Sequence, residues 1–370
     1  MAEINANADG EKKPGLKRAI LPVLISIAIS AYLIAHNFKP ASLKAIHFSS
    51  HLVIGLLLAL LALLIRDFAF ICKVRLSSGN KLSWLQSLQT IILWEFGAAI
   101  VPKLGEVPFV LFILKRNGLS YGRSTGVIML NSFLDNIAFV VVFSVLYLIY
   151  GHHILEVSTN CADLKGTDVV QKVMYHVQQL ASKAWIGYVI FCALGLFFGL
   201  SIFVLPAASK RFFYRLGNTK VLHRFQNTFN HLGDEIEITS NEYKNQPWIF
   251  WVKMLSAAFV NWSMRFLIVN ALIFAFTSPS PNMVQVYARQ YVLWIFQVIP
   301  TTPGGSGWSE ISFIALNCEF MPVGLSVAIA LLWRMYTYYL YLIAGVIVLP
   351  GWLTKTEGQA ELQGRKKLAE

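Results

Sequence analysis

The stretch GVIMLNSFLDNIAFVVVFSVLYLIY, residues 126–150, carries one ionisable side chain, Asp135, in a run made mostly of apolar residues. About 20 apolar residues in a helix span the hydrocarbon core of a bilayer, so this stretch predicts a transmembrane helix. Similar runs occur along the chain, and together they predict about six full transmembrane helices. The others lie at residues 19–35, 52–74, 185–206, 248–277 and 325–349.

The composition agrees with a membrane protein. The chain has 370 residues, of which 56% are hydrophobic and 14% charged, and its mean hydropathy is +0.57, whereas soluble domains carry about 25% charged residues. The net charge of +12 comes mostly from Lys and Arg in short loops beside the apolar runs. Such residues orient helices and contact anionic lipid headgroups. The sequence therefore predicts an all-α polytopic membrane protein with no nucleic-acid partner.

Two further apolar segments are interrupted in the middle. The first, about 82–115, contains Pro-Lys-Leu-Gly-Glu at 102–106, and the second, about 283–320, contains Pro-Thr-Thr-Pro-Gly-Gly-Ser-Gly at 300–307. Proline stops a continuous helix, and glycine permits backbone that other residues do not adopt. Each segment therefore predicts a re-entrant pair of half-helices. One such pair in each half of the chain, entering from opposite faces, is typical of transporters built from inverted repeats, and a channel filter is the alternative.

The distribution of basic residues predicts the orientation. Residues 1–18 are expected to form a polar cytoplasmic N-terminus, residues 19–350 a single membrane domain, and residues 351–370 a cytoplasmic tail. Lys and Arg are concentrated in the loop at 207–247, which is predicted to be cytoplasmic, whereas the loop at 152–183 has balanced charge and is predicted to be external. We expect the protein in a bacterial-type cytoplasmic (inner) membrane.

The cysteines and histidines indicate no metal chemistry. The four cysteines show neither CxxC spacing nor a nearby histidine cluster. This pattern favours small packing residues over a metal site or a disulfide framework. No metal, cofactor or catalytic residue is expected.

Ionisable residues inside the apolar segments are costly unless they are paired or hydrated. Glu106 and Glu310 each follow a glycine-containing break, where half-helix N-termini gather and attract anionic groups. Arg265 and Arg334 complement a phosphate, because a guanidinium matches its oxygens in shape and charge. The residues predicted to bind substrate or line the cavity are Glu95, Lys103, Glu106, Asp135, Arg265, Glu310 and Arg334, with Pro102, Gly105, Pro303, Gly304, Gly305 and Gly307 from the two breaks.

Some of the ionisable residues also have structural interpretations. Arg66 and Asp67 are interpreted as a structural pair near the cytoplasmic interface. Asp135 has two interpretations. It lines the cavity, or it is structural and either caps a neighbouring backbone or pairs with Arg123 or Arg334.

Several motifs occur in a recognisable order. Trp-Glu-Phe-Gly at 94–97, Pro-Lys-Leu-Gly-Glu at 102–106 and Lys-Arg-Asn-Gly-Leu-Ser at 115–120 precede Asp135, and the run at 300–310 ends in Glu310. This set resembles the flippase-like transmembrane domain of the lysylphosphatidylglycerol synthase family, whose signature in the second half is of the type P-G-G-x-G-x-x-E. The resemblance covers most of the chain.

The resemblance implies a lipid-translocating fold with a central cavity and admits a homodimer. Aminoacylating members carry a large soluble C-terminal domain, whereas this chain ends soon after its last apolar run, so it resembles a stand-alone transmembrane domain and is not expected to be an enzyme. Trp308 and Ser309 stand before Glu310 where the family has a small or aliphatic residue and often Arg, which leaves the substrate open.

The sequence favours a lipid flippase or transporter that moves an anionic phospholipid or a polyprenyl-phosphate-linked lipid through a polar cavity. An accessory protein or enzyme of polyprenyl-phosphate-linked glycan metabolism is the alternative, although the acids are scattered and no D-x-D motif occurs. An ion or small-solute channel is the further alternative. No G-x-x-x-x-G-K-[ST] run is present, so nucleotide hydrolysis within this chain is not expected.

Overall fold

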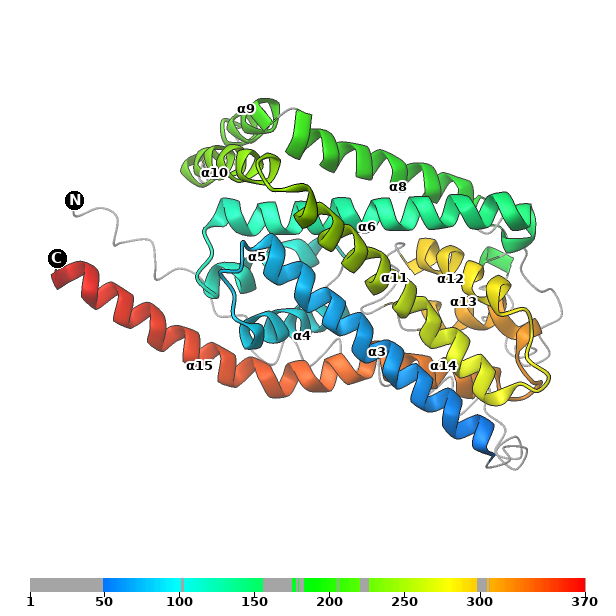
Figure 1. Ribbon diagram of the computed structural model, residues 1–370. Coiled ribbons are helices and arrows are strands. Elements are labelled where there is room, and N and C mark those ends of the chain that lie inside the picture. Colours follow the sequence, from blue (N-terminus) through cyan, green and yellow to red (C-terminus); the bar gives the residue numbers. More distant parts are fainter. Residues whose placement is uncertain are drawn as a thin grey trace.

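The computed structural model describes residues 49–100, 103–155, 175–177, 179, 183–204, 206–219, 226–297, 305 and 307–369. Within these ranges every regular element is a helix, and no strand occurs (Figure 1). The predicted all-α architecture is therefore confirmed for the described part of the chain. The predicted helix at 19–35 and the break residues Pro102, Pro303 and Gly304 lie outside it.

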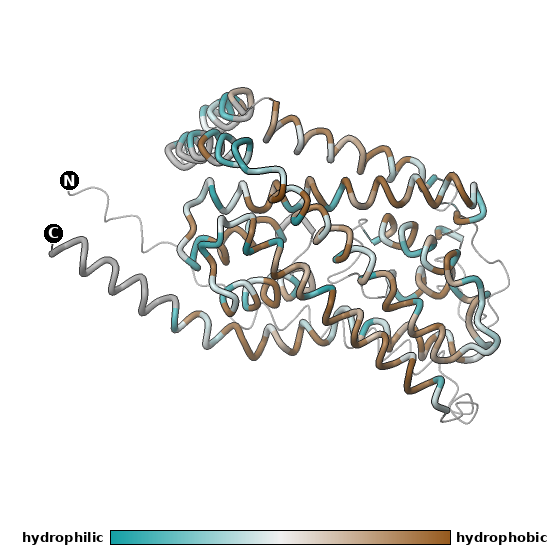
Figure 2. The backbone as a smooth tube through the Cα atoms, in the orientation of Figure 1, coloured by the Kyte–Doolittle hydropathy of each residue, from teal (hydrophilic) through white to brown (hydrophobic). Residues whose placement is uncertain are grey.

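Among the described residues, four helices are long and apolar enough to cross a membrane. They are α3 (Ser50–Ser77), α6 (Tyr121–Tyr150) with the short 3₁₀ turn η1 (Gly151–Leu155), α11 (Trp248–Phe276), and the last helix as far as Lys355. The last helix is divided into α14 (Ser326–Arg334), the π turn η7 (Met335–Tyr339) and α15 (Leu340–Ala369). Hydrophobic residues run along these helices (Figure 2).

The run predicted as a full span at 185–206 is different. It forms α8 (Ala184–Gly199) followed by the π turn η3 (Leu200–Val204), and its apolar helical part, Ala184–Phe197, is shorter than the four spanning helices. A helix rises about 1.5 Å per residue, so this part alone falls short of the hydrocarbon thickness.

Both interrupted segments form two helices. The first gives α4 (Trp84–Ile100) and α5 (Lys103–Arg116), and the second gives α12 (Met283–Gln297) and α13 (Trp308–Asn317). Helix α13 begins after Gly307, whose φ of 85° lies in the left-handed region that favours glycine. Each interrupted segment is therefore divided into two helices, but residues 103–106 of the first predicted break belong to α5, so that break is shorter than predicted.

The helices contact one another in the same order in both halves of the chain. Helix α3 packs on α4, α4 on α5 and α5 on α6, while α11 packs on α12, α12 on α13 and α13 on α14. The two halves also contact each other, since α4 packs on α15 and α12 on α6. Among the described residues the most extensive helix–helix contact joins α3 to α11. There a Cβ built on Gly55 would lie 2.6 Å from the Ala275 Cα.

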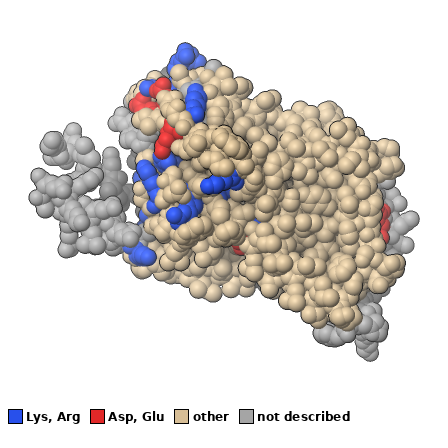
Figure 3. All heavy atoms as spheres, viewed as in Figure 1, with Lys and Arg blue, Asp and Glu red and all other residues tan. Residues whose placement is uncertain are grey.

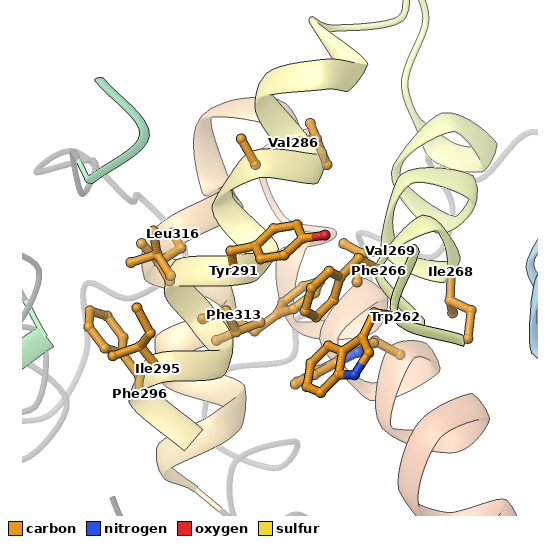
Figure 4. Close-up of a cluster of buried hydrophobic side chains, with 14 of the residues drawn as sticks. Trp262, Phe266, Ile268, Val269, Val286, Tyr291, Ile295, Phe296, Phe313 and Leu316 are labelled. Carbon is orange, nitrogen blue, oxygen red and sulfur yellow. The ribbon is translucent and has the colours of Figure 1, made fainter. Parts of the chain in front are cut away.

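The core lies mainly between α6, α11, α12, α13 and α14. Figure 4 shows Phe266 and Tyr291 directed toward each other within this cluster, and their ring centroids are 4.5 Å apart. The short turn η6 (Cys318–Phe320) follows α13 and adds Phe320 to the cluster.

Two amphipathic helices form the predicted cytoplasmic loop, α9 (Pro206–Gly217) and α10 (Gln226–Lys244). Lys210 Nζ lies 2.7 Å from Asp234 Oδ1 and 3.1 Å from Glu237 Oε2. These hydrogen bonds raise the pKa of Lys210, so the ammonium stays charged well above neutral pH. Lys and Arg gather at this end of the molecule, whereas the rest of the visible face carries few charges (Figure 3).

One expectation about the cysteines is wrong. Cys318 is disulfide-bonded, whereas Cys72 and Cys192 form no disulfide. The fourth cysteine of the sequence, Cys161, lies outside the described residues. Sequence spacing did not indicate this bond, because cysteines far apart in a chain become neighbours only through the tertiary fold.

Candidate functional site

A cavity of about 450 Å³ lies between the two helical halves. Its walls come from α3, α4, α5, α6, α8, α11, α12, α13, the turn η7 and α14, with Gly305 beside α13. Of the ionisable residues predicted from the sequence, it is lined by Glu95, Glu106, Asp135, Arg265 and Arg334. The other lining residues are Phe70, Trp94, Ala98, Ala99, Ser132, Asn136, Phe139, Ile190, Phe191, Leu194, Asn261, Trp262, Phe266, Val269, Gln290, Leu293, Trp294, Gln297, Gly305, Ser309, Trp333, Thr337 and Tyr338.

Glu95 joins two guanidinium groups. Arg265 Nη2 donates to Glu95 Oε1 at 2.6 Å, and Arg66 Nη2 donates to the same oxygen. The Arg66 side chain is 0% exposed, whereas that of Arg265 is 19% exposed and lines the cavity. A carboxylate between two cations can release one of them without losing its charge compensation. Arg265 is therefore the cation of this group that a cavity ligand meets.

Aromatic rings hold Arg265 on its other sides. Its guanidinium carbon lies 5.3 Å from the Trp294 ring centroid and 5.9 Å from that of Trp262. Both rings line the cavity. Cation–π contacts at this distance stabilise a guanidinium and fix its plane.

The Arg66 and Asp67 pair occurs as predicted, with Arg66 Nη1 3.6 Å from Asp67 Oδ1. Tyr341 completes it, since Arg66 Nη1 donates to the Tyr341 hydroxyl at 2.9 Å and that hydroxyl donates to Asp67 at 2.6 Å. The pair thus connects α3 to α15 and also supports Glu95 from behind the cavity wall.

Asp135 pairs with Lys73, whose side chain is 0% exposed. The predicted partners Arg123 and Arg334 are both paired elsewhere, Arg123 with Glu242 and Arg334 with Glu310. Sequence reasoning does not identify Lys73 as a partner, because Lys73 stands near the end of the apolar run at 52–74, where Lys and Arg commonly flank a membrane span. Its spacing from Arg66, seven residues or two helical turns on α3, is the signal that places both on one face.

Glu310 lies behind Arg334 rather than on the cavity wall. Its Oε2 accepts the Gly307 N–H at 2.7 Å, so the carboxylate caps the first turn of α13. Its Oε1 accepts Arg334 Nε at 2.9 Å. Arg334 reaches the cavity, where its guanidinium carbon lies 4.1 Å from the Tyr338 ring centroid. Glu310 therefore positions Arg334 and fixes the start of α13, the second helix of this interrupted segment.

Glu106 occupies the corresponding place in the first half. It lies in the first turn of α5, and its Oε1 accepts Trp94 Nε1–H at 3.3 Å. Gly105 lies in the same turn of α5, and Lys103 is its first residue. The first half thus brings the carboxylate of Glu106 to the cavity, whereas in the second half the carboxylate of Glu310 holds Arg334, and it is Arg334 that reaches the cavity.

The described residues contain no group of three or more His, Cys, Asp or Glu side chains arranged to hold a metal ion. What the cavity offers is two guanidinium groups, three carboxylates and several amides and hydroxyls within walls of aromatic and aliphatic side chains. Such a site suits a ligand with a charged part and an apolar part.

Comparison with known proteins identifies the family to which the chain is similar. A family model described as the lysylphosphatidylglycerol synthase TM region matches residues 19–345. A curated relative named UPF0104 membrane protein, from Archaeoglobus fulgidus, is 24% identical over 336 residues, which are 89% of this chain and 95% of the relative. No solved structure matches.

Proposed function

Since this chain belongs to the lysylphosphatidylglycerol synthase TM-region family of membrane proteins, we propose that it translocates a lipid headgroup through the central cavity. The observation that carries the proposal is the position of Arg265, a guanidinium that faces the cavity while Arg66 retains Glu95 from behind. A phosphate that enters the cavity binds Arg265 through paired N–H groups, and Glu95 stays neutralised by Arg66. The charges of Arg66, Glu95 and Arg265 are therefore compensated both when the cavity is empty and when a phosphate is bound.

The paired charges also explain how the cavity exists inside a membrane. An isolated charge in hydrocarbon is costly, but here Arg265 pairs with Glu95, Lys73 with Asp135 and Arg334 with Glu310. Each charge of such a pair stays compensated when water is removed. A charged headgroup that moves along the cavity leaves one charged side chain and pairs with the next. The acyl chains of the lipid remain in the bilayer throughout.

Both broken segments contribute to the proposed path. We place Glu106 at one break and Arg334, held by Glu310, at the other as successive contacts for the headgroup. The equivalent contact order of the two halves supports an inverted repeat with re-entrant hairpins α4–α5 and α12–α13. Alternating exposure of such a site to the two membrane faces is the expected mode of movement.

The proposed orientation puts both termini in the cytoplasm of a bacterial-type inner membrane. Two observations support it. Basic side chains gather at the end that holds α9 and α10 (Figure 3), as expected for a cytoplasmic face. Cys318, after α13, is disulfide-bonded, and disulfides persist in oxidising compartments such as the periplasm.

A liposome assay tests the function. Purified protein is reconstituted into liposomes that contain a headgroup-labelled fluorescent phospholipid, and a membrane-impermeant quencher is added outside. We expect quenching of more than the outer-leaflet label, in excess over protein-free liposomes. No excess with anionic, zwitterionic or polyprenyl-phosphate lipids would contradict the proposal. Consumption of a glycosyl donor would then favour the enzyme alternative, and conductance in planar bilayers would favour the channel.

A further inference from the structure

Helix α8 differs from the other walls of the cavity. Its contribution is Ile190, Phe191 and Leu194, which are all apolar. The walls from α4, α5, α6, α11 and α14 each contribute an ionisable side chain instead, namely Glu95, Glu106, Asp135, Arg265 and Arg334. Helix α8 contains no Asp, Glu, Lys or Arg at all. Apart from the single residue Phe70 of α3, helix α8 therefore provides the wholly apolar part of the cavity wall.

The apolar wall is continuous with the outer surface of the protein. Ile190 is 50% exposed and Leu194 is 42% exposed, although both line the cavity. In a membrane the exposed part of these side chains lies against hydrocarbon. A hydrocarbon chain in contact with them is thus next to the polar cavity and still within the bilayer.

Close packing holds α8 in this position at the edge of the bundle, alongside α6 (Figure 1). A Cβ on Gly199 would lie 2.6 Å from the Phe133 ring, so glycine allows the two helices to approach. The Phe191 and Phe139 rings stack with centroids 4.6 Å apart. This contact sets the rotation of α8, which turns Ile190 and Leu194 toward the cavity edge.

We propose that Ile190, Phe191 and Leu194 form a subsite for one hydrocarbon chain of the lipid whose headgroup occupies the cavity. This inference rests on the proposed function and deepens it, because it makes a chain-bearing lipid the substrate rather than a free phosphate compound. A chain in the bilayer is already out of water, so this wall contributes van der Waals contact and a fixed position for the chain. The subsite therefore orients the lipid so that its headgroup points at Arg265 and Glu106.

Substitutions on two faces of α8 test the subsite. Ile190→Trp and Leu194→Trp fill the cavity edge, whereas the matched controls Val189→Trp and Leu196→Trp place the same ring on the opposite side of the helix, at residues that are 52% and 66% exposed and do not line the cavity. We expect the first two to slow translocation of a two-chain phospholipid in liposomes about tenfold or more, and the controls to stay within about twofold. Equal effects of all four would indicate a protein interface along α8, such as a second copy of the chain, and would overturn the proposal.

A binding measurement separates this inference from transport. Detergent-solubilised protein is titrated with dioleoylphosphatidylglycerol and with its water-soluble deacylated headgroup, glycerophosphoglycerol, by native mass spectrometry. In Ile190→Trp, and in the milder Ile190→Ala with Leu194→Ala should the tryptophan variant not fold, we expect weaker binding of the two-chain lipid and unchanged binding of the headgroup. Equal weakening of both ligands, or of neither, would overturn the subsite. Failure of wild-type protein to move lipid would refute the proposed function and leave this comparison valid.

Discussion

At the residue scale, the two arginines that pair with Glu95 have different roles. Arg66 is fully buried and bonds Glu95, Asp67 and Tyr341, whereas Arg265 faces the cavity between Trp262 and Trp294. Removal of one partner from a buried pair leaves an uncompensated charge. The first arginine is therefore structural, and the second is available to a ligand.

This difference predicts that two matched variants lose stability to different extents. Arg66→Gln leaves Asp67 and Glu95 with too little positive charge in a buried place, so we expect it to lower the free energy of unfolding by about 3–5 kcal/mol. Arg265→Gln leaves Glu95 on Arg66 and should cost less than about 2 kcal/mol. Thermal unfolding of the purified variants in one detergent checks the order. If Arg265→Gln proved the less stable of the two, the assignment of roles would be wrong.

Sequence reasoning identified the charged residues that line the cavity, but it did not identify all the residues with which they pair. Glu95, Glu106, Asp135, Arg265 and Arg334 stand out because ionisable groups are rare in apolar runs. The pairing of Asp135 with Lys73 was not predictable, because α3 and α6 meet only in the tertiary fold. The aromatic walls were missed for the same reason, since many buried rings in this sequence serve only in packing.

At the element scale, the contact between α3 and α11 joins the two halves. Gly55 lets the helices approach so closely that a Cβ there would meet the Ala275 backbone at 2.6 Å and the Ala271 oxygen at 2.9 Å. Because backbone atoms cannot rotate away, any side chain at this position must push the helices apart. The cavity lies between these halves and depends on their spacing.

We accordingly predict that Gly55→Ala destabilises the protein by about 1–3 kcal/mol. The control is Gly351→Ala, since nothing lies within 4 Å of a Cβ at Gly351, and alanine suits a helix better than glycine. Thermal unfolding in detergent measures both variants. A Gly55→Ala protein as stable as wild type would mean that the two helices are further apart than described.

The sequence also predicted most elements at their observed positions. The Pro and Gly runs indicated that both segments are divided, although residues 103–106 of the first predicted break are helical, and apolar length located α3, α6, α11 and the last helix. The π turns η3 and η7 were not predictable, because an inserted residue in a helix leaves no mark in hydropathy.

At the scale of the whole molecule, the disulfide of Cys318 provides a test of the proposed orientation in the membrane. The sequence has four cysteines, and two of them, Cys72 and Cys192, form no disulfide. Cys161 is the remaining candidate partner, and it lies in the loop that charge balance predicts to be external.

We predict that peptides containing Cys318 and Cys161 are linked in protein purified without reductant. Mass spectrometry of a digest before and after reduction detects the link, and Cys318→Ser should abolish it while Cys72→Ser does not. Alkylation of Cys318 in unreduced protein would contradict both the bond and the external position of the segment after α13.

The most direct test of the account is the rate of lipid translocation when Arg265 loses its charge. In liposomes with a headgroup-labelled anionic phospholipid, we predict that Arg265→Gln is about tenfold to a hundredfold slower than wild type, because a charge-assisted contact to phosphate is lost at the cavity. The control, Lys210→Gln, removes a cation from α9, outside the cavity, and should stay within about twofold. A folded Arg265→Gln protein that moves lipid at the wild-type rate would show that the headgroup does not pass through this site.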